Sequence, residues 1–302
     1  MEPRTPRLRA RALGQYGACL ALVLLGIAGP ARAQESWHTF WSVAGRHNTV
    51  YLLGSVHLLQ PSGSEPPTPV LSAYRAAHAL VMEIDLSQGG ADLLQGSNLE
   101  LLMLPAGQTL ASSLGPDTYG KFLAQAKPLG VDPDFYSRFQ PWFAAVTLEQ
   151  LQFARLGYDP LAGVDQQFAR RAQADNKPVI ALETMSEQLG FFAHLTMEQQ
   201  RRFMLLSLEE AADTPRIMSD VVAAWRRGDT AELNKLLTEG FEKFPDLYRS
   251  LTTDRNRRWM STILPLLDDS RDYLVIVGAL HLVGKDGLIE LLERAGYKPL
   301  QH

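Results

Sequence analysis

The sequence predicts an α/β protein of the α+β kind, in which helices flank a central β-sheet built from two related halves. Two apolar runs rich in β-branched residues, typical of buried strands, lie far apart at residues 49–53 and 273–277. Each run leads into the same short motif, Gly-x-x-His, which suggests the two halves. Residues from about 140 to 267 show the apolar spacing of helices, so we expect a largely helical middle section.

The elements expected in the first half of the chain follow from turn residues and apolar spacing. Glycine and asparagine within residues 45–48 separate two strand-like runs and indicate a hairpin turn. Residues 87–115 show no regular pattern beyond two short helical turns. The other expected elements are a hairpin at 40–53, a loop at 60–69, a helix at 70–79, a strand with acidic residues inside it at 80–86, and a helix at 116–129.

Capping residues and apolar runs define the second half. Thr196 and Gln199 have the spacing of a capping box, and Asp229 precedes a further helix with Glu232 at the matching position. The remaining expected elements are helices at 141–156, 163–176, 245–267 and 286–295, a strand at 177–183, a strand at 273–278 that ends in the glycine of its motif, and an edge strand at 296–300.

The first 33 residues have the composition of a cleavable secretory signal peptide. Four arginines lie within residues 4–11, an apolar run covers residues 16–29, and Ala31, Arg32 and Ala33 form a small-residue cleavage site. The apolar run is shorter than the about 20 residues that a membrane span needs. We therefore expect residues 34–302 to form a single domain, periplasmic or secreted, with no membrane anchor after cleavage.

Cysteine content and charge narrow the function further. Cys19 is the only cysteine and lies inside the signal, so the processed chain has no disulfide, no thiol nucleophile and no cysteine metal site. Residues 1–33 hold five arginines and one glutamate, so their removal changes the net charge from −4 to −8. No basic face is apparent, which argues against a nucleic-acid partner.

Polar side chains stand at the ends of the buried strands or inside them. His57 and His281 close the two Gly-x-x-His motifs, and Glu83 and Glu183 belong to the two strands between them. Strand ends of this kind meet at the edge of an α/β sheet where ligands bind. A carboxylate within an apolar run is costly unless it is paired or binds a metal, and on a strand Glu83 shares a face with Asp85.

Two neutral imidazoles and a carboxylate are a familiar ligand set for a catalytic divalent ion such as Mn, Co or Zn. We expect His57, His281 and Glu83 to bind one such ion. Simpler roles remain open for each residue. Either histidine alone fits a loop position, Glu83 fits a buried partner of an arginine or a helix N-terminus, and Glu183 fits the start of a helix cap.

Residues 254–259 carry four charges and a tryptophan on an expected helix. They form either a solvated face with Trp259 packed inward, or a site where Arg255 points into the cleft and stabilises developing negative charge. The common hydrolase motifs His-Glu-x-x-His and Gly-x-Ser-x-Gly are absent. A nucleophile pair of Ser55 and His57 is a further alternative, without a visible oxyanion partner.

Several of these stretches, in the same order, resemble the TraB/GumN family, which includes the Tiki proteases. They are residues 51–57, 81–85, 157–160, 163–166, 182–184, 187–189, 254–256 and 278–284. The resemblance implies a metal-dependent hydrolase fold related to erythromycin-esterase and ChaN-like proteins. It implies metal or catalytic roles for His57, His281 and Glu83, and a role for the pair Arg255 and Asn256.

The residues and the resemblance together lead to one main hypothesis, a periplasmic or secreted metallohydrolase, peptidase-like, acting on a peptide or small molecule. Glu83 would be a ligand or the general base, and Arg255 and Asn256 would orient substrate or stabilise an oxyanion. Glu183, Asp85 and Asp165 are expected around the ligands. The alternatives are a binding protein that sequesters a peptide or haem-like ligand, an accessory protein of polysaccharide production, and an esterase using Ser55 without a metal.

Overall fold

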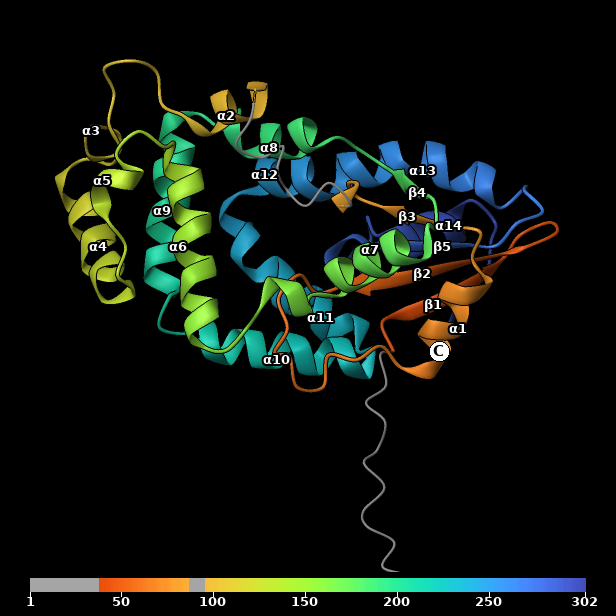
Figure 1. Ribbon diagram of the computed structural model, residues 1–302. Coiled ribbons are helices and arrows are strands. Elements are labelled where there is room, and N and C mark those ends of the chain that lie inside the picture. The colour runs from red at the N-terminus through yellow and green to blue at the C-terminus, as the bar shows by residue number, and fades with distance from the viewer. Residues whose placement is uncertain (1–37, 87–95) are drawn as a thin grey trace, which may run out of the picture. The chain divides into compact units, whose positions relative to one another are not determined.

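A computed structural model describes residues 38–86 and 96–302 (Figure 1). The expected signal peptide, residues 1–33, lies outside the described residues. Residues 35–302 form one compact unit. Within the two described ranges, no helix has the length and apolar character that crossing a membrane requires.

A six-stranded mixed sheet forms the centre of this unit, as expected for the α+β class. Strands β2, β3, β4 and β5 are mutually parallel where they pair, whereas β1 is antiparallel to both β2 and β6. The strand order is β4-β3-β5-β2-β1-β6. The strands are β1 (Phe40–Ala44), β2 (Thr49–Ser55), β3 (Ala79–Met82), β4 (Val179–Ala181), β5 (Tyr273–Gly278) and β6 (Leu300–Gln301).

The two Gly-x-x-His motifs leave the sheet side by side, because their strands β2 and β5 are parallel neighbours. Gly54 stands opposite Val277, and Ser55 stands opposite Gly278. The motifs therefore belong to one sheet, at adjacent strands, although they are separated by more than two thirds of the chain. This register brings the loops after both strands to the same edge.

Several strand ends differ from the prediction, and the differences lie at the site. The strand expected at 80–86 ends at Met82, so Glu83 follows the strand instead of lying inside it, and it does not share a strand face with Asp85. The strand expected at 177–183 is confined to β4, whereas β5 ends at the glycine of its motif, Gly278, as the sequence predicts. Backbone hydrogen bonds continue past β3 and β4, from Leu182 N to Met82 O and from Glu183 N to Glu83 O.

Each face of the sheet is covered by its own helices. Alternate side chains of β5 divide between two cores, with Leu274 and Ile276 in one and Val275 in the other. Helices α1 (Thr68–Ala76), α7 (Val164–Asp175), α10 (Thr214–Arg227) and α11 (Thr230–Thr238) cover the first face, and α13 (Asp254–Leu266) and α14 (Leu288–Arg294) cover the second.

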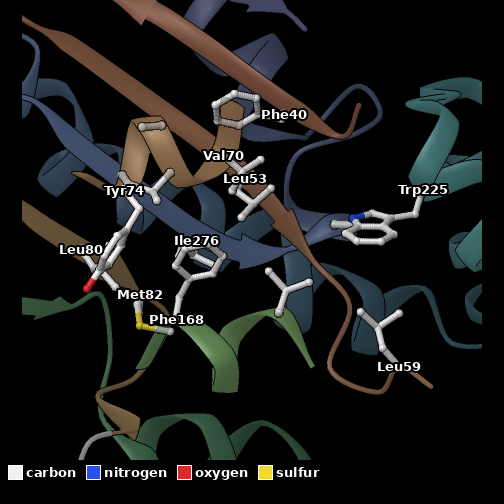
Figure 2. Close-up of a cluster of buried hydrophobic side chains, with 14 of the residues drawn as sticks. Phe40, Leu53, Leu59, Val70, Tyr74, Leu80, Met82, Phe168, Trp225 and Ile276 are labelled. Carbon is white, nitrogen blue, oxygen red and sulfur yellow. The ribbon is translucent and has the colours of Figure 1, made fainter. Parts of the chain in front are cut away.

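The first core fixes α7, which carries a residue of the site. Figure 2 shows the Phe168 ring of α7 among Met82 of β3 and Ile276 of β5, with Tyr74 of α1 nearby. The Tyr74 and Phe168 ring centroids are 5.6 Å apart. Full burial of such aliphatic and aromatic side chains stabilises the fold by roughly 1.5–3 kcal/mol each.

A third core is built by helices alone, in agreement with the expected helical middle section, although it begins before residue 140. Its central pair is α6 and α9, which run side by side in Figure 1. The helices that contribute are α2 (Gly96–Leu102), α3 (Leu110–Leu114), α4 (Pro116–Ala126), α5 (Pro133–Tyr136), α6 (Pro141–Arg155), α8 (Met185–Ala193) and α9 (Met197–Glu210).

A short α12 (Pro245–Tyr248) leads through a π-helical turn, Arg249–Thr253, into α13. Such turns are rare and often accompany functional sites. Here the turn immediately precedes Arg255. The sequence predicted one or two continuous helices over 245–267 and did not reveal this irregularity.

Candidate functional site

Gly278, the last residue of β5, is the point around which the candidate site residues gather. A Cβ at this position would lie 3.2 Å from Glu83 Oε1, 3.6 Å from His57 Nε2 and 3.6 Å from His281 Cδ2. The Gly278 N–H donates a 2.7 Å hydrogen bond to Glu83 Oε1. Glycine here therefore leaves room for the Glu83 carboxylate and holds it through the backbone.

His57 is positioned by the start of α7. Its Nδ1 lies 3.1 Å from Asp165 Oδ2, and because a carboxylate only accepts, Nδ1 carries the proton. The helix start is locked onto the His57 loop by a bond from Val164 N to Val56 O of 3.1 Å. A Cβ on Gly163 would lie 2.2 Å from His57 O, so only glycine permits this approach.

The Asp165 carboxylate raises the pKa of His57 to about 9. The His57 side chain is 63% exposed and lines a cavity, so water screens part of this effect. With Nδ1 held by Asp165, His57 Nε2 is the ring atom left for a ligand. Asp165, predicted to lie around the metal ligands, is brought to His57 from a distant part of the chain.

His281 is held in the same tautomer by a different partner. Its Nδ1 lies 2.7 Å from Asn256 Oδ1, while Asn256 Nδ2 donates to the carbonyls of His281 and Asp286. Desolvation by burial lowers the pKa of His281 to about 3, so the ring is neutral. Asn256 is fully buried and does not line the cavity, so it contacts the histidine and not the space where a substrate would lie.

Glu83 is an ionised carboxylate with four polar neighbours. Burial alone would raise its pKa, but the charges of Arg255 and His57, with the Gly278 amide, hold the pKa of this carboxyl well below its ordinary value. Its Oε2 accepts from Arg255 Nη2 at 2.6 Å and from Gln188 Nε2 at 3.1 Å. Its Oε1 is 3.9 Å from His281 Nε2.

All five N–H donors of Arg255 are taken within the cluster. Nε and one Nη2 hydrogen reach Glu183, and the other Nη2 hydrogen reaches Glu83. One Nη1 hydrogen reaches Leu251 O at 3.0 Å in the π-helical turn, and the other reaches His281 Nε2 at 3.0 Å. The guanidinium also lies 4.7 Å from the centre of the Trp259 ring. Both views of residues 254–259 are therefore partly right, since Trp259 packs inward and Arg255 enters the site.

Glu183 lies behind Arg255 and away from the cavity. Its side chain is fully buried and accepts from Arg255, from Arg258 Nη2 at 3.3 Å and from Gln188 at 3.2 Å. Desolvation raises its pKa, and Arg255 opposes the rise. The helix cap that the sequence suggested here belongs to the next residue, because Thr184 forms a capping box with Glu187 at the start of α8.

Asp85 is the one predicted site residue that the structure leaves outside the cluster. It is exposed and does not line the cavity. Gln188, which contacts both glutamates, is a site residue that sequence reasoning did not assign. Gln188 belongs to the stretch at residues 187–189 that resembles the TraB/GumN family, and this stretch could have pointed to it. Nothing in the sequence, however, indicated that α8 packs over Glu83.

The donor chemistry suits a divalent cation. Each histidine presents Nε2 while an oxygen holds its Nδ1, the arrangement that metal-bound histidines use, and Glu83 supplies a carboxylate. Among residues 38–86 and 96–302, however, no three such side chains stand together as a metal site. The guanidinium of Arg255 contacts both His281 Nε2 and Glu83 Oε2, so these two atoms become available together only when Arg255 shifts.

A cavity of about 740 Å³ opens beside the cluster, a volume typical of small-molecule sites. His57, Glu83, Arg255 and His281 line one end of it. Ser55 also lines the cavity, but its Oγ makes no hydrogen bond with any described residue. Nothing there activates Ser55 as a nucleophile, so the geometry does not support the Ser55 alternative.

Comparison with known proteins identifies the class to which this fold and site belong. Residues 39–301 match the TraB/PrgY/gumN family, and the chain therefore belongs to that family. It is 27% identical to the uncharacterized protein YbaP of Shigella flexneri over 82% of this chain and 88% of that protein.

Two further relatives extend the comparison. The chain is 27% identical to YbaP of Escherichia coli K12 over 80% of this chain and 87% of that protein. An uncharacterized protein of Treponema pallidum is 22% identical, over 70% and 64% of the respective chains. No solved structure matches the chain significantly.

Proposed function

We propose that this member of the TraB/PrgY/gumN family is a metal-dependent hydrolase, peptidase-like, that acts in the periplasm or outside the cell. The proposal rests chiefly on one observation. Two histidines from adjacent parallel strands, each with Nδ1 bound to an oxygen, approach the same ionised glutamate at Gly278. Preset tautomers beside a carboxylate suit ligation better than a purely structural role.

His57 Nε2, His281 Nε2 and Glu83 would hold the cation, for which Mn, Co and Zn are candidates. Such an ion lowers the pKa of bound water and polarises a carbonyl. Asp165 and Asn256 act through the histidines, because each binds Nδ1 and leaves Nε2 as the ring atom available for ligation. Ligation by His57 also releases its Nε2 proton, because Asp165 raises the pKa of this ring to about 9. Binding by imidazole and carboxylate also suits a processed chain without cysteine.

Arg255 couples ligand binding to catalysis. While it contacts Glu83, the low pKa of that carboxylate makes it a weak base. When His281 Nε2 and Glu83 serve as ligands, Arg255 has one Nη1–H and one Nη2–H free. These two donors can stabilise a developing oxyanion. In the alternative in which Glu83 is the general base and not a ligand, loss of the Arg255 contact would raise the basicity of Glu83 towards a water proton.

Metal analysis of the purified protein tests the proposal. We expect a stoichiometric divalent metal in the wild-type protein after Mn, Co or Zn loading, and its loss in a His57→Ala/His281→Ala double variant. A His47→Ala/His78→Ala variant is the control, because both histidines lie away from the cavity. Equal metal content in all three proteins would contradict the proposal.

The size of the cavity supports a second candidate, a protein that sequesters a peptide or haem-like ligand without turnover. A screen against peptide libraries with added Mn, Co or Zn separates the two functions. Cleavage that Glu83→Gln abolishes, while ligand binding persists, excludes pure sequestration. Ligand binding without any cleavage in the loaded wild-type protein favours it.

A further inference from the structure

We propose that the cavity binds the apolar acyl chain of an ester or amide whose carbonyl lies at the His57 and Glu83 end. The claim about binding stands on the cavity itself. The claim that the carbonyl is hydrolysed rests on the proposed function. The argument depends on where polar groups lie along the cavity wall.

Most of the wall away from the cluster is apolar and comes from four helices. Helices α6, α8, α10 and α11 all contribute apolar side chains to it. Aromatic rings and methionine thioethers accompany the aliphatic side chains, and methionine adapts well to flexible apolar ligands. The principal contributors are Trp142, Phe143, Phe192, Met185, Met218 and Leu237.

Polar partners are few beyond the cluster. Thr147 lines the wall, but its hydroxyl already donates to Phe143 O at 2.8 Å within α6. Gln188 is bound to the two glutamates, and Gln150 stands exposed near the rim. An extended peptide carries a donor and an acceptor on every residue, and these would stay unpaired against such a wall. A hydrocarbon chain has no such requirement.

Charge at the polar end argues for an uncharged head group. Glu83 and Asp165 are the carboxylates that line the cavity there, Asp165 is paired with His57, and every N–H of Arg255 is already used. A fatty-acid carboxylate would therefore meet like charges and no free guanidinium donor. An ester or amide carbonyl avoids this repulsion and supplies the electrophile that a hydrolase needs.

The test measures binding to the metal-free full chain. N-phenyl-1-naphthylamine, a neutral probe that fluoresces in apolar surroundings, is bound and then displaced by methyl butyrate, methyl octanoate, methyl dodecanoate or the matching free acids. We expect affinity to rise roughly fourfold for each added CH₂ until the cavity is full. Esters should displace the probe better than acids of equal length. Absence of chain-length dependence, or preference for the acids, would overturn the assignment.

Cavity-filling variants locate the binding site. Val146→Trp on α6 and Met218→Trp on α10 each place a larger side chain in the cavity wall, from two different helices. Leu151→Trp is the control, because it adds a side chain of the same size on the exposed face of α6. We expect the folded cavity variants to bind the esters about tenfold or more weakly, because several CH₂ groups of the ester can no longer be buried. The control should bind the esters as the wild type does. Circular dichroism selects the folded proteins. Unchanged affinity in either folded cavity variant would contradict the proposal.

Two measurements keep this inference apart from the proposed function. Probe and ester binding that persists in His57→Ala/His281→Ala, together with absence of metal from the wild-type protein, overturns the hydrolase proposal alone. Metal binding without ester binding overturns the acyl-chain assignment alone. Displacement of the probe by apolar peptides at lower concentration than by methyl dodecanoate also overturns it.

Discussion

Individual hydrogen bonds decide what the cluster can do chemically. His57 and His281 present the same ring atom for different reasons, since one is held by a carboxylate and the other by a buried amide. Arg255 then occupies His281 Nε2 and Glu83 at once. At this scale a cation that binds His281 Nε2 and Glu83 Oε2 has to displace Arg255, whereas His57 Nε2 is open to it.

Removal of the Arg255 charge should be costly for the fold. Arg255→Met leaves the buried Glu83 without its guanidinium partner and Glu183 with only the longer contact to Arg258, so we expect a loss of about 3–5 kcal/mol in the free energy of unfolding at neutral pH. The loss should shrink as pH falls, because protonation removes the uncompensated charges. Urea titrations at several pH values measure it. An Arg255→Met/Glu183→Gln double variant as unstable as the single one would contradict this account.

Gly278 offers a substitution that affects the site more than the fold. Its φ of −50° suits alanine, but the added Cβ would sit 3.2 Å from Glu83 Oε1. We expect Gly278→Ala to weaken metal binding by about tenfold or more by displacing that carboxylate, with little change in melting temperature. Metal titration and thermal unfolding measure the two effects. Gly120→Ala, in the open on α4, is the control and should leave metal affinity unchanged.

Secondary-structure elements place these residues through their ends. The start of α7 brings Asp165 to His57, and the π-helical turn before α13 brings a free carbonyl to Arg255. The start of α8 covers both glutamates with Gln188. Helix interiors supply the cores, whereas helix and strand ends supply the site.

Glu149, on α6 beside α9, has a shifted pKa although it lies outside the candidate site. Burial raises the pKa of Glu149 on α6 to about 7, and the Glu210 carboxylate adds to the rise. The folded state therefore keeps a proton that the unfolded chain releases above its ordinary value of 4.5, so this residue destabilises the fold increasingly as pH rises from 4.5 to 7.

Glu149→Gln should remove this penalty. We expect the variant to be more stable than the wild type by on the order of 1–3 kcal/mol above pH 7, with no gain near pH 4. Chemical denaturation at both pH values measures the difference. The exposed Glu293→Gln variant on α14 should show no such pH-dependent gain. A Glu149→Gln gain that is equal at both pH values would refute the explanation.

The whole molecule joins two packing systems, the sheet with its helices and the helical core of α2 to α9. The cavity is lined by residues of both, so a ligand there would contact the two together. Ligation at the β2 and β5 loops would likewise stabilise the folded chain relative to the unfolded one.

Metal removal tests this coupling globally. We expect a chelator to lower the melting temperature of metal-loaded wild-type protein, because a ligand at one hundred times its Kd stabilises by about 2.7 kcal/mol. The His57→Ala/His281→Ala variant should melt at the same temperature with and without chelator. Differential scanning calorimetry provides the measurement. An equal chelator effect on both proteins would place the metal elsewhere.

Much of this architecture was predictable from local patterns. The hairpin of β1 and β2, the strand β5, the helical middle section and the capping box of α9 all follow from residue spacing. The ends of β3 and β4 could not be predicted, because an apolar run does not show where the hydrogen-bonded pairing of strands stops. The π-helical turn was also hidden, since its residues differ little from those of an ordinary helix.

The sequence by itself indicated which residues gather at the candidate site, namely the histidines of the paired Gly-x-x-His motifs, Glu83 and Arg255. Only the tertiary structure decided their partners, because Asp165 lies 108 residues from His57 and Arg255 lies 172 residues from Glu83. Contacts at such separation depend on strand order and helix packing, which local spacing does not encode. The same holds for the apolar cavity, whose walls come from helices that meet only in the folded chain.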